Sequence, residues 1–134
     1  MQAIHKFQIQ TRNHAEFHEI TGEVEACVTT SGLKAGVATV YVPHTTAGLT
    51  INENADPDVR ADMLQSLELM VPWNQPHFRH GEGNSAAHIK ASMMGFSTTI
   101  LIESGALALG RWQGIYLCEF DGPRTRQVWV RVSG

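Results

Sequence analysis

The chain has 134 residues, the usual length of one domain, and its 43% apolar and 17% charged residues are typical of a globular protein rather than a disordered one. Its formal net charge of −3 and the lack of any basic run argue against a nucleic-acid partner. No apolar stretch is long enough to cross a bilayer, and residues 1–10 alternate instead of forming a secretory signal, so we expect no membrane contact. Cys27 and Cys118 are expected to be buried thiols in a reducing compartment, which favours a cytoplasmic protein.

The first half of the chain predicts short strands around one helix. Alternating apolar residues predict a strand over 4–9 and a shorter one over 17–20. Thr21 is the expected N-cap of a helix that ends near Gly32. The β-branched stretch 36–43 predicts the clearest strand, and another follows through 49–51.

The second half predicts two more helices and three strands. Asp56 followed by Pro57 predicts a helix start, and the apolar residues behind it recur at helical spacing up to Met70. Residues 72–84 are irregular, and a helix is expected from Ser85 to Gly95. The remaining strands are expected at 97–102, 115–120 and 128–132, with a hairpin turn at 121–124 between the last two.

These elements amount to about six or seven strands and three helices. Such a mixture predicts an α+β protein with a mostly antiparallel sheet or sandwich, and residues 1–134 form one domain.

Four of the seven histidines lie in or beside the irregular middle of the chain: His44, His77, His80 and His88. In the segment from His80 to His88, two glycines allow close approach of the backbone, and a helix start offers free N–H groups to an anion. Neutral imidazoles are also good zinc ligands, although the spacing matches no standard zinc signature. Metal binding, anion binding and satisfied structural histidines therefore all stay open.

Further polar residues allow a functional and a structural interpretation. Thr46, Asn52 and Glu53 suit either a polar pocket or an exposed turn, and Arg124 suits either a phosphate or an ion pair with Asp121. The common nucleotide-binding, hydrolase and metalloprotease motifs are absent from the sequence.

Three segments carry a family resemblance: PHTTAGLTINENADPDV, HGEGNSAAHIKASMMG and LALGRWQGIYLCEFDGPRTRQVWV. Together, in this order, they resemble the YjbQ family, which is often labelled secondary thiamine-phosphate synthase. The resemblance implies a β-sandwich-like α+β fold, a homotrimer, and a pocket near a subunit boundary where histidines hold a metal ion. Carried over to this sequence, the ligands are His44, His80 and His88, and zinc is the expected divalent metal.

The resemblance leads to two functional hypotheses. The first is an enzyme acting on a phosphorylated small molecule, with weak thiamine-phosphate synthase activity and with Glu53 or Glu103 as acid or base. The alternative is a metal- or metabolite-binding protein without significant catalysis. In either case the candidate substrate-binding residues are Thr46, Asn52, Asn84, Ser85, Gln113 and Arg124.

Overall fold

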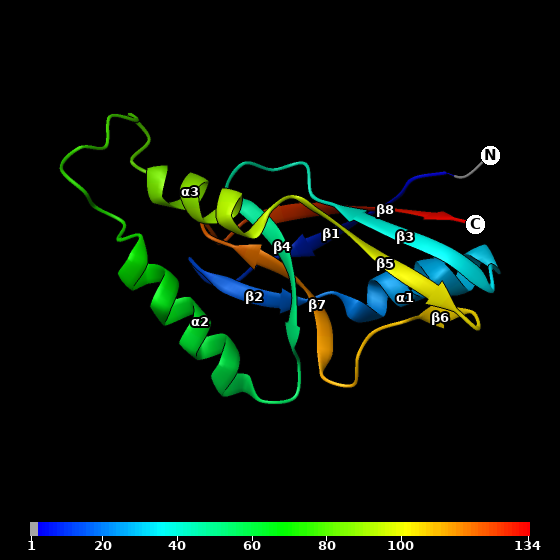
Figure 1. Cartoon of the computed structure of the whole chain (residues 1–134). Helices are drawn as coiled ribbons and strands as arrows, with labels where there is room; N and C mark the ends of the chain where they lie inside the picture. The colour runs from blue at the N-terminus through cyan, green and yellow to red at the C-terminus, as the bar shows by residue number, and fades with distance from the viewer. Residues whose placement is uncertain (1–2) are drawn as a thin grey trace.

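The computed structural model describes residues 3–134, which form two antiparallel sheets and three helices (Figure 1). The five-stranded sheet has the order β1 (His5–Gln10), β8 (Thr125–Ser133), β3 (Ala35–Tyr41), β5 (Ser97–Glu103) and β6 (Ala106–Leu107). The three-stranded sheet has the order β2 (Glu16–Glu19), β7 (Gln113–Glu119) and β4 (Ala47–Glu53).

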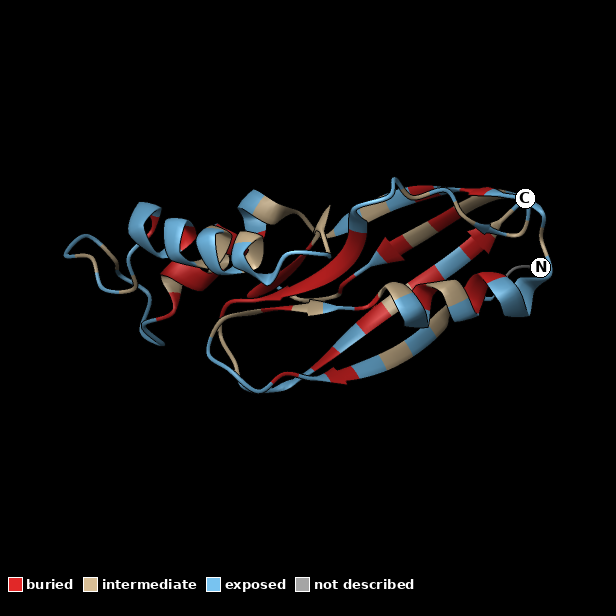
Figure 2. Ribbon diagram, turned by 90° about the horizontal axis from the view of Figure 1, so that it is seen from below, coloured by how far each residue is buried: buried red, intermediate tan, exposed pale blue. Residues whose placement is uncertain are grey.

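The main core lies between the inner faces of the two sheets. Val40 and Val130 of the large sheet and Leu117 of the small sheet belong to one buried cluster, and all three are fully buried. Each such side chain contributes about 1.5–3 kcal/mol relative to an exposed position. Helix α1 (Thr21–Ser31) adds Val24 and Val28 to this cluster and contacts both sheets (Figure 2). The strand periodicity of the sequence thus builds a sandwich closed by one helix.

Helices α2 (Pro57–Met70) and α3 (Ser85–Met94) lie on the other side of the small sheet (Figure 1). A second buried cluster joins Tyr116 of β7 to Leu67 of α2 and Ala91 of α3. The two helices are tied together by Lys90, whose Nζ lies 2.6 Å from a carboxylate oxygen of Glu68. None of the helices within residues 3–134 is long and apolar enough to span a membrane.

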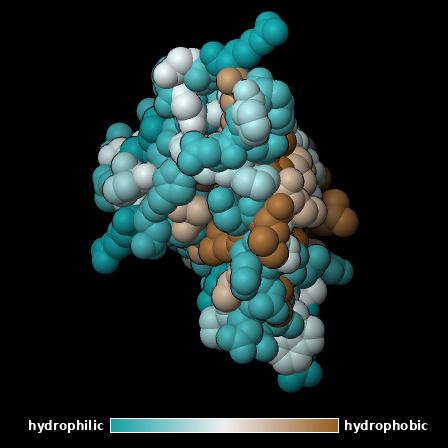
Figure 3. All heavy atoms as spheres, turned by 90° about the vertical axis from the view of Figure 1, so that its left-hand side faces the viewer, coloured by the Kyte–Doolittle hydropathy of each residue, from teal (hydrophilic) through white to brown (hydrophobic). Residues whose placement is uncertain are grey.

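Both the large sheet and the helix layer leave apolar side chains at the surface. On the outer face of the large sheet, Leu101 is 64% exposed and Tyr41 42% exposed, and no helix of the described chain packs over them. Figure 3 shows apolar surface on the side of the molecule that carries α2 and α3, where Leu69 is 73% exposed and Met93 50% exposed. These two faces are available for contact with other molecules.

The predicted class, α+β with three helices and antiparallel sheets, is confirmed. The predicted cap at Asp56 is also confirmed, because its side chain accepts a hydrogen bond from the Asp58 N–H at 2.9 Å. Thr21 is not an N-cap: Ile20 takes that place, and the Thr21 hydroxyl accepts the Ile115 N–H at 2.9 Å instead. The short strand β6 was not expected.

The predicted hairpin at 121–124 is wrong. β7 pairs with β2 and β4, whereas β8 pairs with β1 and β3, so the turn carries the chain from one sheet to the other. Gly122 packs against the opposite loop, where its N–H donates to the His14 carbonyl at 2.9 Å. A Cβ at Gly122 would lie 2.3 Å from the Asn13 carbonyl oxygen, so this close crossing requires glycine.

Candidate functional site

The first hollow lies where β3 ends and β8 begins. It has a volume of about 480 Å³. Its lining comes from the β3–β4 loop and the start of β8: Tyr41, Pro43, His44, Thr45, Thr46, Arg124 and Arg126. It is called the arginine hollow below.

A buried ion pair forms the floor of the arginine hollow. Arg126 is 3% exposed and Glu119 is fully buried, and the Arg126 guanidinium donates to both carboxylate oxygens of Glu119. Arg126 Nη2 also donates to the Thr46 hydroxyl at 2.8 Å, and the Thr11 hydroxyl donates to Glu119 at 2.8 Å. Burial alone would raise the pKa of Glu119, but the hydrogen bonds, above all that from Arg126, hold it below its usual value. The pair is therefore ionised and fixed in position.

His44 stands half-buried at the edge of this hollow. Its Nε2 accepts the backbone N–H of Gln127 at 2.8 Å. Burial lowers the pKa of His44, and the nearby positive charge of Arg126 lowers it further. His44 is therefore neutral near pH 7, and its Nε2 lone pair is already engaged.

The second hollow lies at the start of α3 and has a volume of about 640 Å³. It is lined by His77, Phe78, Arg79, His80, Ser85, His88 and Ile89, and is called the histidine hollow below. The imidazole rings of His80 and His88 are 5.5 Å apart between centroids and nearly perpendicular. The glycine-containing loop and the first turn of α3 thus bring these two histidines together.

Asp121 connects the two hollows. One of its carboxylate oxygens accepts the Asn84 side-chain amide at 2.8 Å and Arg124 Nη2 at 3.0 Å. Asn84 directly precedes Ser85, which lines the histidine hollow, and Arg124 lines the arginine hollow, so a single carboxylate links residues beside the two hollows. Asn84 is 7% exposed, and its Oδ1 has no hydrogen-bond partner within the described chain. A buried acceptor of this kind suits a donor group from a ligand or a water molecule.

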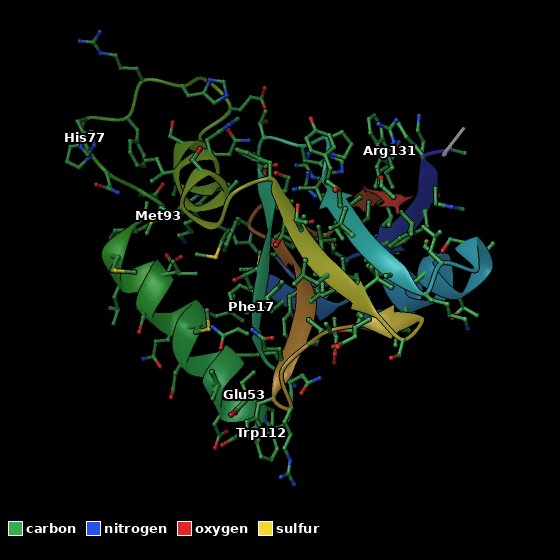
Figure 4. All side chains as sticks on the ribbon, turned by 45° about the vertical axis from the view of Figure 1, so that its right-hand side comes forward. Phe17, Glu53, His77, Met93, Trp112 and Arg131 are labelled. Carbon is green, nitrogen blue, oxygen red and sulfur yellow. The ribbon has the colours of Figure 1, made fainter. Side chains whose placement is uncertain are left out.

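Several predicted site residues lie elsewhere. Glu53 pairs with Gln113 at the far end of β4, and β4 begins directly after Thr46. The strand rise places Glu53 roughly 20 Å from Thr46. Asn52, the neighbour of Glu53, donates to the Met63 sulfur at 3.3 Å. Figure 4 shows Glu53 at the lower edge of the molecule, well away from His77 at the upper left. Glu103 closes β5 at the end remote from the arginine hollow.

The three predicted zinc ligands do not meet within one chain. His44 lines the arginine hollow, whereas His80 and His88 line the histidine hollow. Across residues 3–134, no three His, Cys, Asp or Glu side chains are grouped closely enough to hold one metal ion. The engaged Nε2 of His44 is a further reason, because a zinc ligand needs a free nitrogen lone pair. A three-histidine zinc site therefore does not fit the arrangement in a single chain.

Comparison with known proteins identifies the family. The sequence profile described as "UPF0047 protein YjbQ-like" matches residues 5–134. The chain belongs to the UPF0047/YjbQ family. It is 53% identical to the UPF0047 protein YugU of Bacillus subtilis over 95% of this chain and 96% of that protein. It is 50% identical to the UPF0047 protein MJ1081 of Methanocaldococcus jannaschii over 96% and 93% of the respective chains.

Two solved structures have the same fold. A YjbQ/UPF0047 protein of Clostridium acetobutylicum superposes with a TM-score of 0.94 at 52% identity, covering 96% of this chain and 98% of that one. The protein APE1520 of Aeropyrum pernix superposes with a TM-score of 0.92 at 34% identity, covering 98% of both chains. The YjbQ resemblance and the fold it implied are confirmed.

The floor of the arginine hollow was not part of the predicted site, although the third family segment contains both Glu119 and Arg126. Arg126, Glu119 and Thr11 were absent from the predicted site, although the sequence carried a signal for the first. Arg126 occupies the same strand face as Val128 and Val130, so a charge stands where strand alternation demands a buried side chain. A buried charge requires a partner, and Glu119, at the end of the buried run of β7, supplies it.

Proposed function

We propose that this YjbQ-family protein binds a phosphorylated small molecule across the two hollows and acts on it as an enzyme. The Asp121 carboxylate carries the proposal, because it binds both Arg124 of the arginine hollow and Asn84, the residue just before the free N–H groups at the start of α3. Helix starts and arginine side chains are the groups that bind phosphate oxygens. Ser85 and Arg124 are the residues with which we expect the phosphate groups to interact.

The weak thiamine-phosphate synthase activity is part of this proposal as a side reaction. That reaction joins a pyrimidine diphosphate to a thiazole phosphate, so it needs room for two phosphorylated reactants. The two hollows, of about 480 and 640 Å³, support this requirement. Zinc is left out of the proposal, because the three histidines of one chain do not gather.

The binding test compares two arginines. Arg124→Ala should weaken the binding of inorganic pyrophosphate about tenfold or more, because a hydrogen bond to a charged group is worth about 1.5–3 kcal/mol. Arg111→Ala is the matched control, since Arg111 stacks on the exposed Trp112 and lines neither hollow. Isothermal titration calorimetry of both variants measures the effect. Equal affinities in the two variants would refute the role of the arginine hollow.

The alternative, a metabolite-binding protein without significant catalysis, is favoured by one observation. Both carboxylates proposed as acid or base, Glu53 and Glu103, lie away from the hollows. Phosphorus-31 NMR of the two thiamine-phosphate synthase reactants with the protein separates the hypotheses. Release of diphosphate at rates above the protein-free sample supports the enzyme, and tight binding without any change in the reactants supports the alternative.

We also propose that the chain forms a homotrimer through the outer face of its large sheet. This face carries exposed Leu101 and Tyr41, and Tyr41 also lines the arginine hollow. Association there would set the hollow beside a subunit boundary. Leu101→Glu should dissociate the assembly in light scattering after size exclusion, whereas Leu69→Glu on α2 should leave it intact. An unchanged mass for Leu101→Glu would exclude this face.

A further inference from the structure

The backbone around His44 determines which of its nitrogens carries the proton. The pairing of β3 with β8 stops at Tyr41 opposite Trp129. Gln127 of β8 lies two residues beyond this last pair. Its N–H donates to the side-chain Nε2 of His44 at 2.8 Å, and not to a backbone carbonyl of β3. The imidazole therefore takes the place of a ladder acceptor at the point where the strands separate.

An imidazole nitrogen that accepts an N–H carries no proton of its own. In the neutral ring the single proton must then reside on the other nitrogen, Nδ1. Nδ1 has no hydrogen bond to any other residue between 3 and 134, and His44 lines the arginine hollow. His44 is thus held as a neutral ring with one unused donor.

Two further unused donors stand beside it. Arg126 directs Nε and Nη2 at Glu119 and Thr46, and its Nη1 makes no hydrogen bond within the described residues. Nη1 also keeps some contact with the surface. Within the described residues, Asn84 Oδ1 is the one side-chain nitrogen or oxygen that is both fully buried and without a partner, so Nη1 is not fully buried. The Thr46 hydroxyl accepts from Arg126 and so has its own proton free to donate.

From this arrangement we infer that His44 is a fixed hydrogen-bond donor, through Nδ1–H, to a phosphoryl oxygen of the bound molecule, and not a metal ligand. Arg126 Nη1 and the Thr46 hydroxyl complete the set of donors. Because buried Glu119 balances the charge of Arg126, the phosphoryl group is bound mainly by these hydrogen-bond donors, which the fold holds in fixed directions. The inference rests on the proposed function and names the part of the site that holds the phosphoryl group.

Two substitutions separate the nitrogens of His44. The His44→Gln side chain reaches the Nε2 position, so it keeps the acceptor for Gln127 and removes the Nδ1 donor. The His44→Asn side chain reaches only the Nδ1 position and keeps the donor. We expect His44→Gln to weaken pyrophosphate binding about tenfold to a hundredfold, in line with a hydrogen bond to a charged group. His44→Asn should stay within about threefold of the wild type, a smaller loss than one neutral hydrogen bond.

The controls keep the outcomes distinct. His5→Gln makes the same chemical change on β1, outside both hollows, and should bind pyrophosphate like the wild type. Two-bond proton–nitrogen NMR spectra of histidine-labelled protein should show His44 as the Nδ1–H tautomer, and added zinc chloride should leave its signals in place.

An Nε2–H tautomer, zinc-induced shifts of His44, or equal pyrophosphate affinity in His44→Gln and wild type would each overturn the inference. Failure of the wild type to bind pyrophosphate or phosphate at all would overturn the proposed function, and the inference with it.

Discussion

Replacing Arg126 with methionine should be one of the most destabilising single changes in this protein. The substitution leaves the Glu119 carboxylate fully buried, with only Thr11 and the Asp121 N–H as donors. Removing one partner of a buried ion pair costs about 3–5 kcal/mol, because the remaining charge loses its compensation. For a chain of 134 residues this corresponds to a fall of roughly 10–20 °C in the melting temperature.

Urea unfolding followed by circular dichroism measures this loss. Arg12→Met is the control, because Arg12 is exposed and its side chain makes no hydrogen bond within the described residues, and it should change the stability by about 0.5 kcal/mol or less. The double variant Glu119→Gln with Arg126→Met should regain at least about 1.5 kcal/mol, since no buried charge is left. A loss below about 1 kcal/mol in Arg126→Met, or strictly additive losses in the double variant, would refute the reasoning.

Three further predictions test other parts of the structure. Burial and Arg126 lower the pKa of His44, so below about pH 6.5 the unfolded chain binds more protons than the folded one, and the unfolding free energy should fall on acidification. Between pH 7.5 and 5.5, the urea midpoint of His44→Gln should therefore decline less than that of the wild type. An equal decline in the two proteins would contradict the assignment. Asp56→Ala removes the α2 cap and should cost about 1 kcal/mol in the same titration at pH 7, whereas an unchanged midpoint would show the cap to be dispensable. Gly48→Ala puts a Cβ 2.7 Å from the carbonyl oxygen of Gly95, which follows α3, and should lower the unfolding free energy by about 1–3 kcal/mol. Gly22→Ala, in open space within α1, should raise it by about 0.5–1 kcal/mol. The opposite order of stability in these two variants would contradict the packing.

Local sequence patterns were sufficient for the elements but not for their partners. Alternation identified β3 and β8, and the Asp56–Pro57 pair identified the start of α2, because these signals are contained in a few neighbouring residues. The turn at 121–124 has the composition of a reversal, yet composition does not say whether the next strand joins the same sheet. Strand pairing depends on contacts between residues distant in sequence, so the transfer from β7 to the other sheet was not predictable from the turn.

The same distinction explains the candidate site. Thr46, Asn84 and Arg124 were predicted from motifs far apart in the chain, and Arg126 and Asp121 link them at the two hollows. Asn52 and Glu53 were predicted from the motif that contains Thr46, and the structure separates them from it. Proximity in sequence implies proximity in space only within a turn or a helix, and an extended strand carries each residue about 3.3 Å further away.

A histidine's capacity to bind a metal depends on what its lone pair already does. As sequence letters, His44, His80 and His88 cannot be told apart as ligands, because each has a nitrogen of the kind that zinc prefers. In the fold, one backbone N–H engages His44 Nε2, whereas the rings of His80 and His88 pack nearly perpendicular to each other with their centroids 5.5 Å apart. His44 thus becomes a donor through Nδ1–H, because β8 leaves the N–H of Gln127 without a partner in β3 and this N–H engages Nε2. Residue types alone do not give this assignment, because the deciding group is the main-chain N–H of Gln127, 83 positions away in the sequence.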